Sequence, residues 1–241
     1  MLAAVAFIAS TLSAVTGFGG AAVLLPVLVW AVGMREAVPI LTVAQLIGNG
    51  SRVWFNRKMV DYHVVAWFAI GGVPLAITGG FLFAKAPLSA LTRVLGLFLI
   101  IIVVWRHSRQ GRLPKPSLHQ FALIGAGSSF LSALLGSVGP LMAPLFLGYG
   151  LVKGAYIGTE ALATVVMHLA KLIAYRQSDL LHQHALVVGL LLGPTMICGS
   201  FIGKKIVDAL PEKLCGLCTL RTHRFRAYFK HGGTLPEAVS R

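Results

Sequence analysis

Long apolar runs separated by short polar segments dominate this chain. We delimit seven of them, at residues 2–32, 38–55, 63–84, 87–105, 118–150, 155–175 and 183–203. A helix needs about 20 residues to cross the hydrocarbon core of a bilayer. Five runs fit a single crossing, whereas the first and fifth are longer and are interrupted by glycine. The pattern predicts an all-α polytopic membrane protein.

The two long runs are broken at comparable places, Thr16–Gly20 and Gly136–Pro140. Irregular backbone at membrane depth is tolerated only inside protein or beside a wet cavity, and a helix that starts after a break points free N–H groups at that cavity. The following residues of the breaks are therefore predicted to wall a small-anion site: Gly17, Phe18, Gly19, Gly20, Gly136, Gly139 and Pro140. The alternative is that these glycines only allow tight helix packing.

The chain repeats itself at an offset of 117 to 120 residues. The segment 74–81 (PLAITGGF) matches 194–201 (PTMICGSF), and Thr42 matches Thr159. Internal duplication is a common plan of secondary transporters. We predict two homologous halves, residues 1–105 and 118–213, joined by a basic linker at 106–117 and followed by a basic tail at 214–241.

The distribution of Lys and Arg favours one arrangement of these halves. If all seven runs cross once, nine basic residues share the side after the second run and twelve lie opposite. If the two long runs dip in and return, sixteen lie on the linker side and five opposite, which follows the positive-inside rule far better. This predicts an inverted repeat with two broken hairpins meeting near the midplane, and a cytoplasmic linker and tail.

Composition agrees with a membrane protein. Apolar residues make up 56% of the chain, charged residues 12%, and the mean hydropathy is +0.81, whereas soluble domains have about 25% charged residues. These values exclude an ordinary soluble enzyme, a disordered chain and a disulfide scaffold. The net charge of +14 lies in short loops and the tail, so we assign it to membrane orientation rather than to nucleic-acid binding. The N-terminus has no basic region before its apolar run, so residues 1–15 are expected to stay in the mature protein.

Enzyme and metal motifs are not found in the sequence. One Cys215-x-x-Cys218 pair with irregularly spaced histidines is a weak zinc signal. No zinc-protease, phosphate-loop or nucleophile-elbow motif is present. We predict no enzyme activity, no cofactor and no metal.

Two helical stripes of polar residues run through the second and sixth apolar runs. The first stripe consists of Thr42, Gln45, Asn49 and Arg52, and the second of Glu160, Thr164, His168 and Lys171, beside Thr159. Spacings of three and four keep each stripe on one helix face. Neutral donors suit the oxygens of an anion, so the predicted substrate ligands in these runs are Thr42, Gln45, Asn49 and Thr159. Hydrogen bonding between helices is the alternative.

Glu160 and His168 are the titratable acid and imidazole well inside this pattern. Either group could carry a coupled proton. The alternative is structural: Glu160 pairs with a helix end or with Lys153, and His168 bonds across helices.

At these motifs the sequence resembles the TauE/SafE family of sulfite exporters and toluene-sulfonate uptake permeases. The first half carries Thr16–Gly20, Leu24-Leu25-Pro26, Gly33 and Thr42, and the second half carries Gly136-x-x-Gly139-Pro140, Pro144 and Lys153-x-x-x-x-Gly158-Thr159. The resemblance covers residues 1–213. It implies a bacterial inner-membrane protein of two repeated halves that moves sulfite or organosulfonates, with the glycine motifs, Thr42 and Thr159 around the anion path.

The end of the chain departs from the family pattern, in which a last apolar helix matching 87–105 is usual. Here Pro211–Leu214 begins such a helix, and the following residues are too few and too basic to cross. The last helix of the second half is therefore expected to be missing, which would leave that half exposed unless a partner or another copy of the chain covers it.

We therefore predict a transporter of small anions, of the sulfite or organosulfonate class by the resemblance, that works by alternating access. Proton coupling stays open, with Glu160 and His168 as its candidate residues. The open alternatives are a passive anion channel and a non-transporting membrane assembly subunit. The partners expected are the anion and the lipid bilayer, with no nucleic acid, and a homo-oligomer is left open.

Overall fold

The computed structural model describes residues 2–16, 20–108 and 115–209. Within these ranges every regular element is a helix, in agreement with the all-α prediction. The predicted site residues Gly17, Phe18 and Gly19 lie outside the described residues. So do the tail 214–241 and most of the linker.

The helices of the first half follow the predicted runs. They are α1 (Leu2–Thr16), α2 (Gly20–Val32), α3 (Met34–Asn56), the short 3₁₀ helix η1 (Arg57–Met59), α4 (Tyr62–Lys85) and α5 (Leu88–Ser108). The first long run is thus two helices flanking the glycine segment. Gly33, at a φ of +78°, ends α2 and allows the turn into α3.

The second half repeats this order. Its helices are α6 (Gln120–Leu135), α7 (Gly139–Tyr149), α8 (Lys153–Gln177), α9 (Gln183–Leu191) and α10 (Gly193–Ala209). The second long run is also broken where glycine predicts it. Gly136, at a φ of +80°, caps α6 by donating its N–H to the carbonyl of Ser132 at 2.9 Å.

Three segments in the described part of the chain are long and apolar enough to cross a membrane: Tyr62–Lys85, Lys153–Gln177 and Gln183–Ala209. The runs 38–55 and 87–105, also expected to cross, form α3 and α5, of 23 and 21 residues. Helix α3 is long enough, at about 1.5 Å per residue, but its mean hydropathy is lowered by polar residues. Those residues include Gln45, Asn49 and Arg52, which are all buried inside the protein.

The seventh run is not a straight helix, because α9 and α10 meet at Leu192. Gly193-Pro194 follows this point, and proline removes a backbone donor while glycine leaves the chain free to bend. The matching Pro74 follows the stiffer Val73 and lies inside the uninterrupted helix α4. The repeat is therefore similar in sequence at this place but different in backbone.

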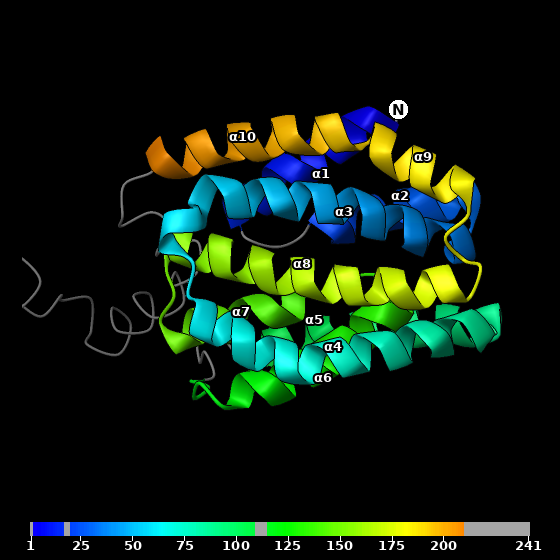
Figure 1. Ribbon diagram of the computed structural model, residues 1–241, viewed down its shortest axis with the longest axis horizontal. Coiled ribbons are helices and arrows are strands. Elements are labelled where there is room, and N and C mark those ends of the chain that lie inside the picture. The colour runs from blue at the N-terminus through cyan, green and yellow to red at the C-terminus, as the bar shows by residue number, and fades with distance from the viewer. Residues whose placement is uncertain (1, 17–19, 109–114, 210–241) are drawn as a thin grey trace, which may run out of the picture.

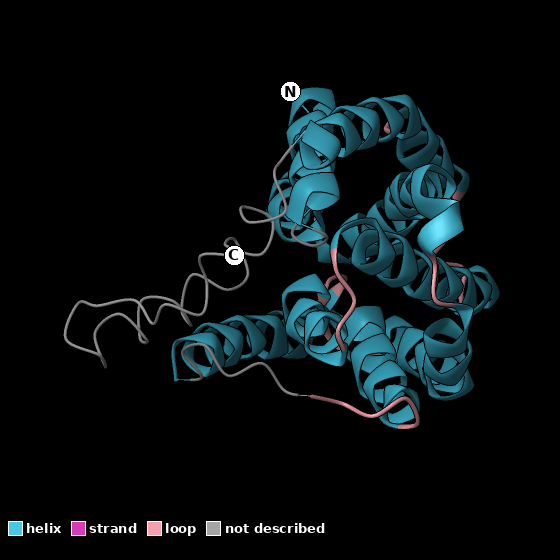
Figure 2. Cartoon of the chain, turned by 90° about the vertical axis from the view of Figure 1, so that its left-hand side faces the viewer, coloured by secondary structure: helices cyan, strands magenta, loops and turns pink. Residues whose placement is uncertain are grey.

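The helices form two groups that exchange members between the halves. In Figure 1, α1, α2, α3, α9 and α10 lie above, and α4, α5, α6, α7 and α8 lie below. Helix α1 packs along α10, and α6 packs along α4, so the first helix of each half lies against a later helix of the other half. The view in Figure 2, turned by 90°, shows the helices packed as a bundle.

The central pair, α3 and α8, runs antiparallel. The end of α3 meets the start of α8: Arg52 lies against Glu160, and Asn56 lies against Gly154 and Gly158. The colour ramp of Figure 1 shows the same opposite directions. These two helices, which the sequence repeat matches to one another, thus run in opposite directions.

Small residues bring the exchanged helices together. A β-carbon at Gly71 of α4 would lie 1.9 Å from the Ala122 carbonyl oxygen, and one at Gly125 of α6 would lie 2.1 Å from that of Phe68. No side chain fits at either place, so the two backbones touch directly. The glycine-packing alternative therefore holds for these glycines, which lie outside the two breaks.

The α1–α10 contact is built in the same way, with an added polar link. Gly199 and Gly203 of α10 face the backbone and small side chains of α1. The hydroxyl of Ser10 donates to the carbonyl of Met196 and lies 3.1 Å from the hydroxyl of Ser200. These contacts fix the first helix of one half against the last described helix of the other.

Candidate functional site

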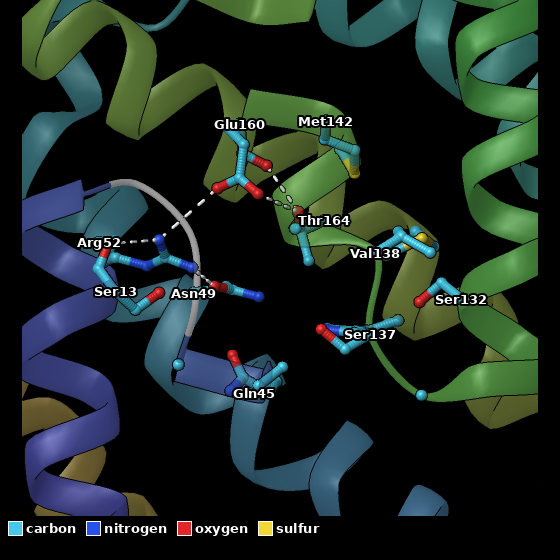
Figure 3. A pocket seen from close by; sticks show the side chains of 16 residues that line it. Ser13, Gln45, Asn49, Arg52, Ser132, Ser137, Val138, Met142, Glu160 and Thr164 are labelled. Carbon is cyan, nitrogen blue, oxygen red and sulfur yellow. Dashed lines mark hydrogen bonds and ion pairs between the residues drawn. The ribbon is translucent and has the colours of Figure 1, made fainter. Parts of the chain in front are cut away.

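A pocket lies where the two broken runs meet the central helices. Its wall is formed by the end of α1, the start of α2, one face of α3, the end of α6, the break before α7, and α8. Both halves therefore contribute, as Figure 3 shows for the labelled side chains. The cavity volume is about 30 Å³, and one buried water needs about 10–15 Å³. A pocket of this size fits an ion of a few heavy atoms.

Arg52 is the cation of this wall. Its side chain is 5% exposed, and Nη1 lies 3.6 Å from Oε2 of Glu160. Nη1 also donates to the carbonyl of Ser13 at 3.2 Å, and Nη2 donates to Oδ1 of Asn49. Arg52 thus holds the last turn of α1, its own helix α3 and helix α8 of the other half together, at the edge of the pocket (Figure 3).

Glu160 is the acid opposite this cation. Its side chain is 4% exposed, and Oε1 accepts a hydrogen bond of 3.2 Å from the hydroxyl of Thr164. Oε2 faces Arg52 but accepts no hydrogen bond from the residues that the structure describes. A buried carboxylate needs a counter-charge, and here this charge comes from the other half rather than from Lys153.

Two amide groups on α3 carry unused donors beside the pocket. Gln45 and Asn49 are 4% and 1% exposed. Gln45 Nε2 and Asn49 Nδ2 are buried and find no acceptor among the described residues. An unpaired buried donor costs about 1–3 kcal/mol, so two of them on one wall favour a ligand with hydrogen-bond acceptors.

The break before α7 adds one more donor. Pro140 has no N–H, and the amides of Leu141 and Met142 both donate to the carbonyl of Val138. Gly139 is the first residue of α7, so its amide has no acceptor within that helix. The helix N-terminus therefore offers fewer free N–H groups than the sequence suggests, because proline and a 3₁₀-type bond remove two of them.

His168 and Lys171 complete the α8 side. His168 lines the pocket, and its Nδ1 is buried without a partner among the described residues. Lys171 is completely buried and donates to the hydroxyl of Ser132 at 3.1 Å. Ser132 itself lines the pocket, so Lys171 supports the wall from behind.

The structure brings most of the predicted and described site residues together. Those that line the pocket are Gly20, Gln45, Asn49, Gly136, Gly139, Glu160 and His168. Pro140, Thr42 and Thr159 are not part of its wall. Thr42 donates to the carbonyl of Val38 at 2.8 Å, and Oγ1 of Thr159 accepts the N–H of Asp61 at 2.9 Å. The hydroxyl of Thr42 is thus used within helix α3, and that of Thr159 links α8 to the start of α4.

Other wall residues were not predicted as ligands. Arg52 continues the stripe of Gln45 and Asn49, and its periodicity could have identified it. Ser13 and Ser132 precede the two breaks in the sequence and line the pocket from α1 and α6. A single serine in an apolar helix carries no signal of this kind, so only the fold identifies these two.

Comparison with known proteins gives one match. A sequence model of the family described as "Sulfite exporter TauE/SafE" matches residues 2–220 of the 241. Neither the curated proteins nor the solved structures contain a match.

Proposed function

The chain belongs to the TauE/SafE family of membrane transporters, and from this premise we propose that it moves small anions of the sulfite and organosulfonate class. The proposed location is the bacterial inner membrane, with the linker and tail in the cytoplasm. The anion binds in the pocket between the two breaks. The observation that carries this proposal is a buried, donor-rich wall supplied by both halves.

The chemistry of the pocket suits an oxyanion. Arg52 supplies a guanidinium, Gln45 and Asn49 supply N–H donors without acceptors among the described residues, and Gly139 supplies the first amide of helix α7. Sulfite and sulfonate groups present three oxygens that accept such hydrogen bonds, and bonds to a charged acceptor are the strong ones. The cavity of about 30 Å³ admits the anionic head group, so a larger organosulfonate requires a wider conformation.

The proposed mechanism is alternating access about an inverted repeat. Supporting it, the equivalent helices α3 and α8 run antiparallel, and the pocket lies between them. The two hairpins α1–α2 and α6–α7 flank the pocket from opposite ends of the bundle (Figure 1). Rocking of one half against the other would open the pocket to each side in turn.

A proton is proposed to accompany the anion. Glu160 and His168 both line the pocket and are buried, so either could change charge there at the moment when the substrate binds. Buried ionisable groups of this kind mark proton relays in transporters.

The test is anion flux in proteoliposomes, with sulfite and methanesulfonate, with and without a pH gradient. Gly139→Leu places a large side chain on the pocket wall, and Gly127→Leu is the matched control, because a β-carbon at Gly127 meets open space. Saturable flux that Gly139→Leu abolishes and Gly127→Leu retains supports the transporter.

Two other results would point elsewhere. Flux that does not saturate and ignores the gradient identifies a passive channel. No flux from correctly inserted protein, together with stable co-purification of a partner, identifies an assembly subunit.

A further inference from the structure

The two charged side chains at the pocket, Arg52 and Glu160, differ in how many hydrogen bonds hold their facing atoms. Arg52 bonds to Ser13 and Asn49, so its position is fixed from two sides. Glu160 approaches it at 3.6 Å, beyond hydrogen-bond distance, and its Oε2 has no donor among the described residues. The cation is therefore firmly placed, whereas the carboxylate oxygen that faces it is loosely held.

The neutral donors lie beside the cation, on the same helix. Gln45 Nε2 and Asn49 Nδ2 come from α3, as Arg52 does, and Glu160 accepts from neither. In Figure 3, Asn49 and Gln45 lie on the Arg52 side of the pocket, and Glu160 reaches toward Arg52 from α8. An oxyanion bound by Arg52, Gln45 and Asn49 together would therefore take the position beside the guanidinium that the Glu160 carboxylate now occupies.

We propose that Glu160 is a built-in competitor of the substrate: its carboxylate neutralises Arg52 in the empty pocket, and the entering oxyanion displaces it. This inference rests on the proposed function, and it adds that the substrate anion replaces the Glu160 carboxylate as the partner of Arg52. The displaced carboxylate takes a proton from solvent on Oε2 and becomes a neutral acid. Two negative charges beside one buried guanidinium are thereby avoided.

The other charged and titratable groups around Glu160 can be named. Arg52 faces it from α3, and Tyr156, His168 and Lys171 lie on α8 itself. The described parts of α1, α2, α6 and α7 present only neutral side chains to the pocket. Two further elements pack on α8, and their charged side chains and histidine lie outside the pocket wall: Arg57 and Lys58 of η1, and Asp61, His63 and Lys85 at the ends of α4. His168 and Lys171 are thus the competing proton acceptors that an experiment has to separate from Glu160.

The test measures protons taken up per anion bound, by calorimetry on the purified full chain in detergent. Methanesulfonate and sulfate serve as probes, because neither titrates near neutral pH. Titrations in two buffers of different ionisation enthalpy then report protons bound by the protein alone. The wild type is expected to take up a proton on binding, and its affinity is expected to rise as the pH falls.

Glu160→Gln keeps the shape and removes the competing charge. We expect it to bind the anion roughly ten- to a hundredfold more tightly, because the anion no longer has to break the attraction between Glu160 and Arg52, with no proton uptake. Glu36→Gln is the matched control, since Glu36 is half-exposed, pairs with His184 and lies outside the pocket. It should bind like the wild type.

Several outcomes would overturn the inference. Wild-type binding without proton uptake removes the displacement step and leaves the proposed function intact, and this measurement needs no variant. Proton uptake that persists in Glu160→Gln assigns the proton to His168 or Lys171. Weaker binding by a folded Glu160→Gln makes Glu160 a ligand or support instead of a competitor. No binding of either anion by the wild type removes the proposed function as well.

Discussion

Replacing Gln45 by methionine is expected to stabilise the protein while it weakens anion binding. Gln45 is 4% exposed, and its Nε2 has no acceptor among the described residues. The unpaired donor costs about 1–3 kcal/mol. Methionine is nearly isosteric, and its own misfit costs less than about 1.5 kcal/mol. The net change in the free energy of unfolding is therefore about +1 kcal/mol.

The same substitution removes one donor from the anion. A hydrogen bond to a charged partner contributes about 1.5–3 kcal/mol, so the affinity for methanesulfonate should fall roughly ten- to a hundredfold. Stability and binding thus move in opposite directions, which is typical of a group that is positioned for a ligand and not for the fold.

The assay is thermal unfolding of the purified protein with and without the anion. A gain of about 1 kcal/mol corresponds to about 2–4 °C in Tm for a chain of 150–250 residues. Saturating anion should raise the Tm of the wild type above its anion-free value, because binding stabilises the folded state. The same anion concentration should raise the Tm of Gln45→Met much less. Gln177→Met makes the same change at the exposed end of α8 and should alter neither quantity.

A lower Tm for Gln45→Met in the absence of anion would refute the reasoning, because it would mean that the amide stabilises the fold. An unchanged affinity would show that Gln45 does not face the anion.

Three further predictions concern the scaffold. Gly125→Ala should lower stability by about 1–3 kcal/mol through overpacking, because its β-carbon would lie 2.1 Å from a carbonyl oxygen of α4. Gly127→Ala on the same helix meets open space and should keep or slightly raise the Tm, because alanine is the better helix former. Asp61→Ala should cost about 1 kcal/mol, since Asp61 caps α4 by accepting two backbone N–H groups, whereas Asp61→Asn should cost little in the same unfolding experiment. In a cysteine-free background, cysteines at Arg57 and Arg176 should react with an impermeant thiol reagent from opposite faces of the membrane, and labelling from one face would exclude the inverted arrangement.

Local patterns in the sequence were enough to predict the helical membrane class and the position of the second break. Runs of apolar residues report helix length directly, and glycine followed by proline interrupts a helix whatever surrounds it. The end of α6 at Leu135 and the start of α7 at Gly139 follow from Gly136 and Pro140 in this way. The flanks of the first break, Thr16 and Gly20, agree equally well.

Periodicity also identified helix faces that line the pocket, but not the use of each side chain. Thr42 and Gln45 share a stripe on α3, yet the hydroxyl of Thr42 returns to its own helix and only Gln45 reaches the pocket. A β-hydroxyl can bond to the preceding turn, whereas the longer amide of glutamine extends outward. Helical spacing alone does not distinguish these two outcomes.

Local patterns were thus enough for the helical membrane class, the glycine breaks and the two polar stripes. Helix packing alone shows that α1 lies along α10 and α6 along α4, and that Glu160 meets Arg52 instead of Lys153 on its own helix. Glu160 and Arg52 are more than a hundred residues apart. Their contact depends on how closely the glycine-lined helices α3 and α8 approach one another. This distance is set by packing between the helices, and the periodicity of either helix sequence does not report it.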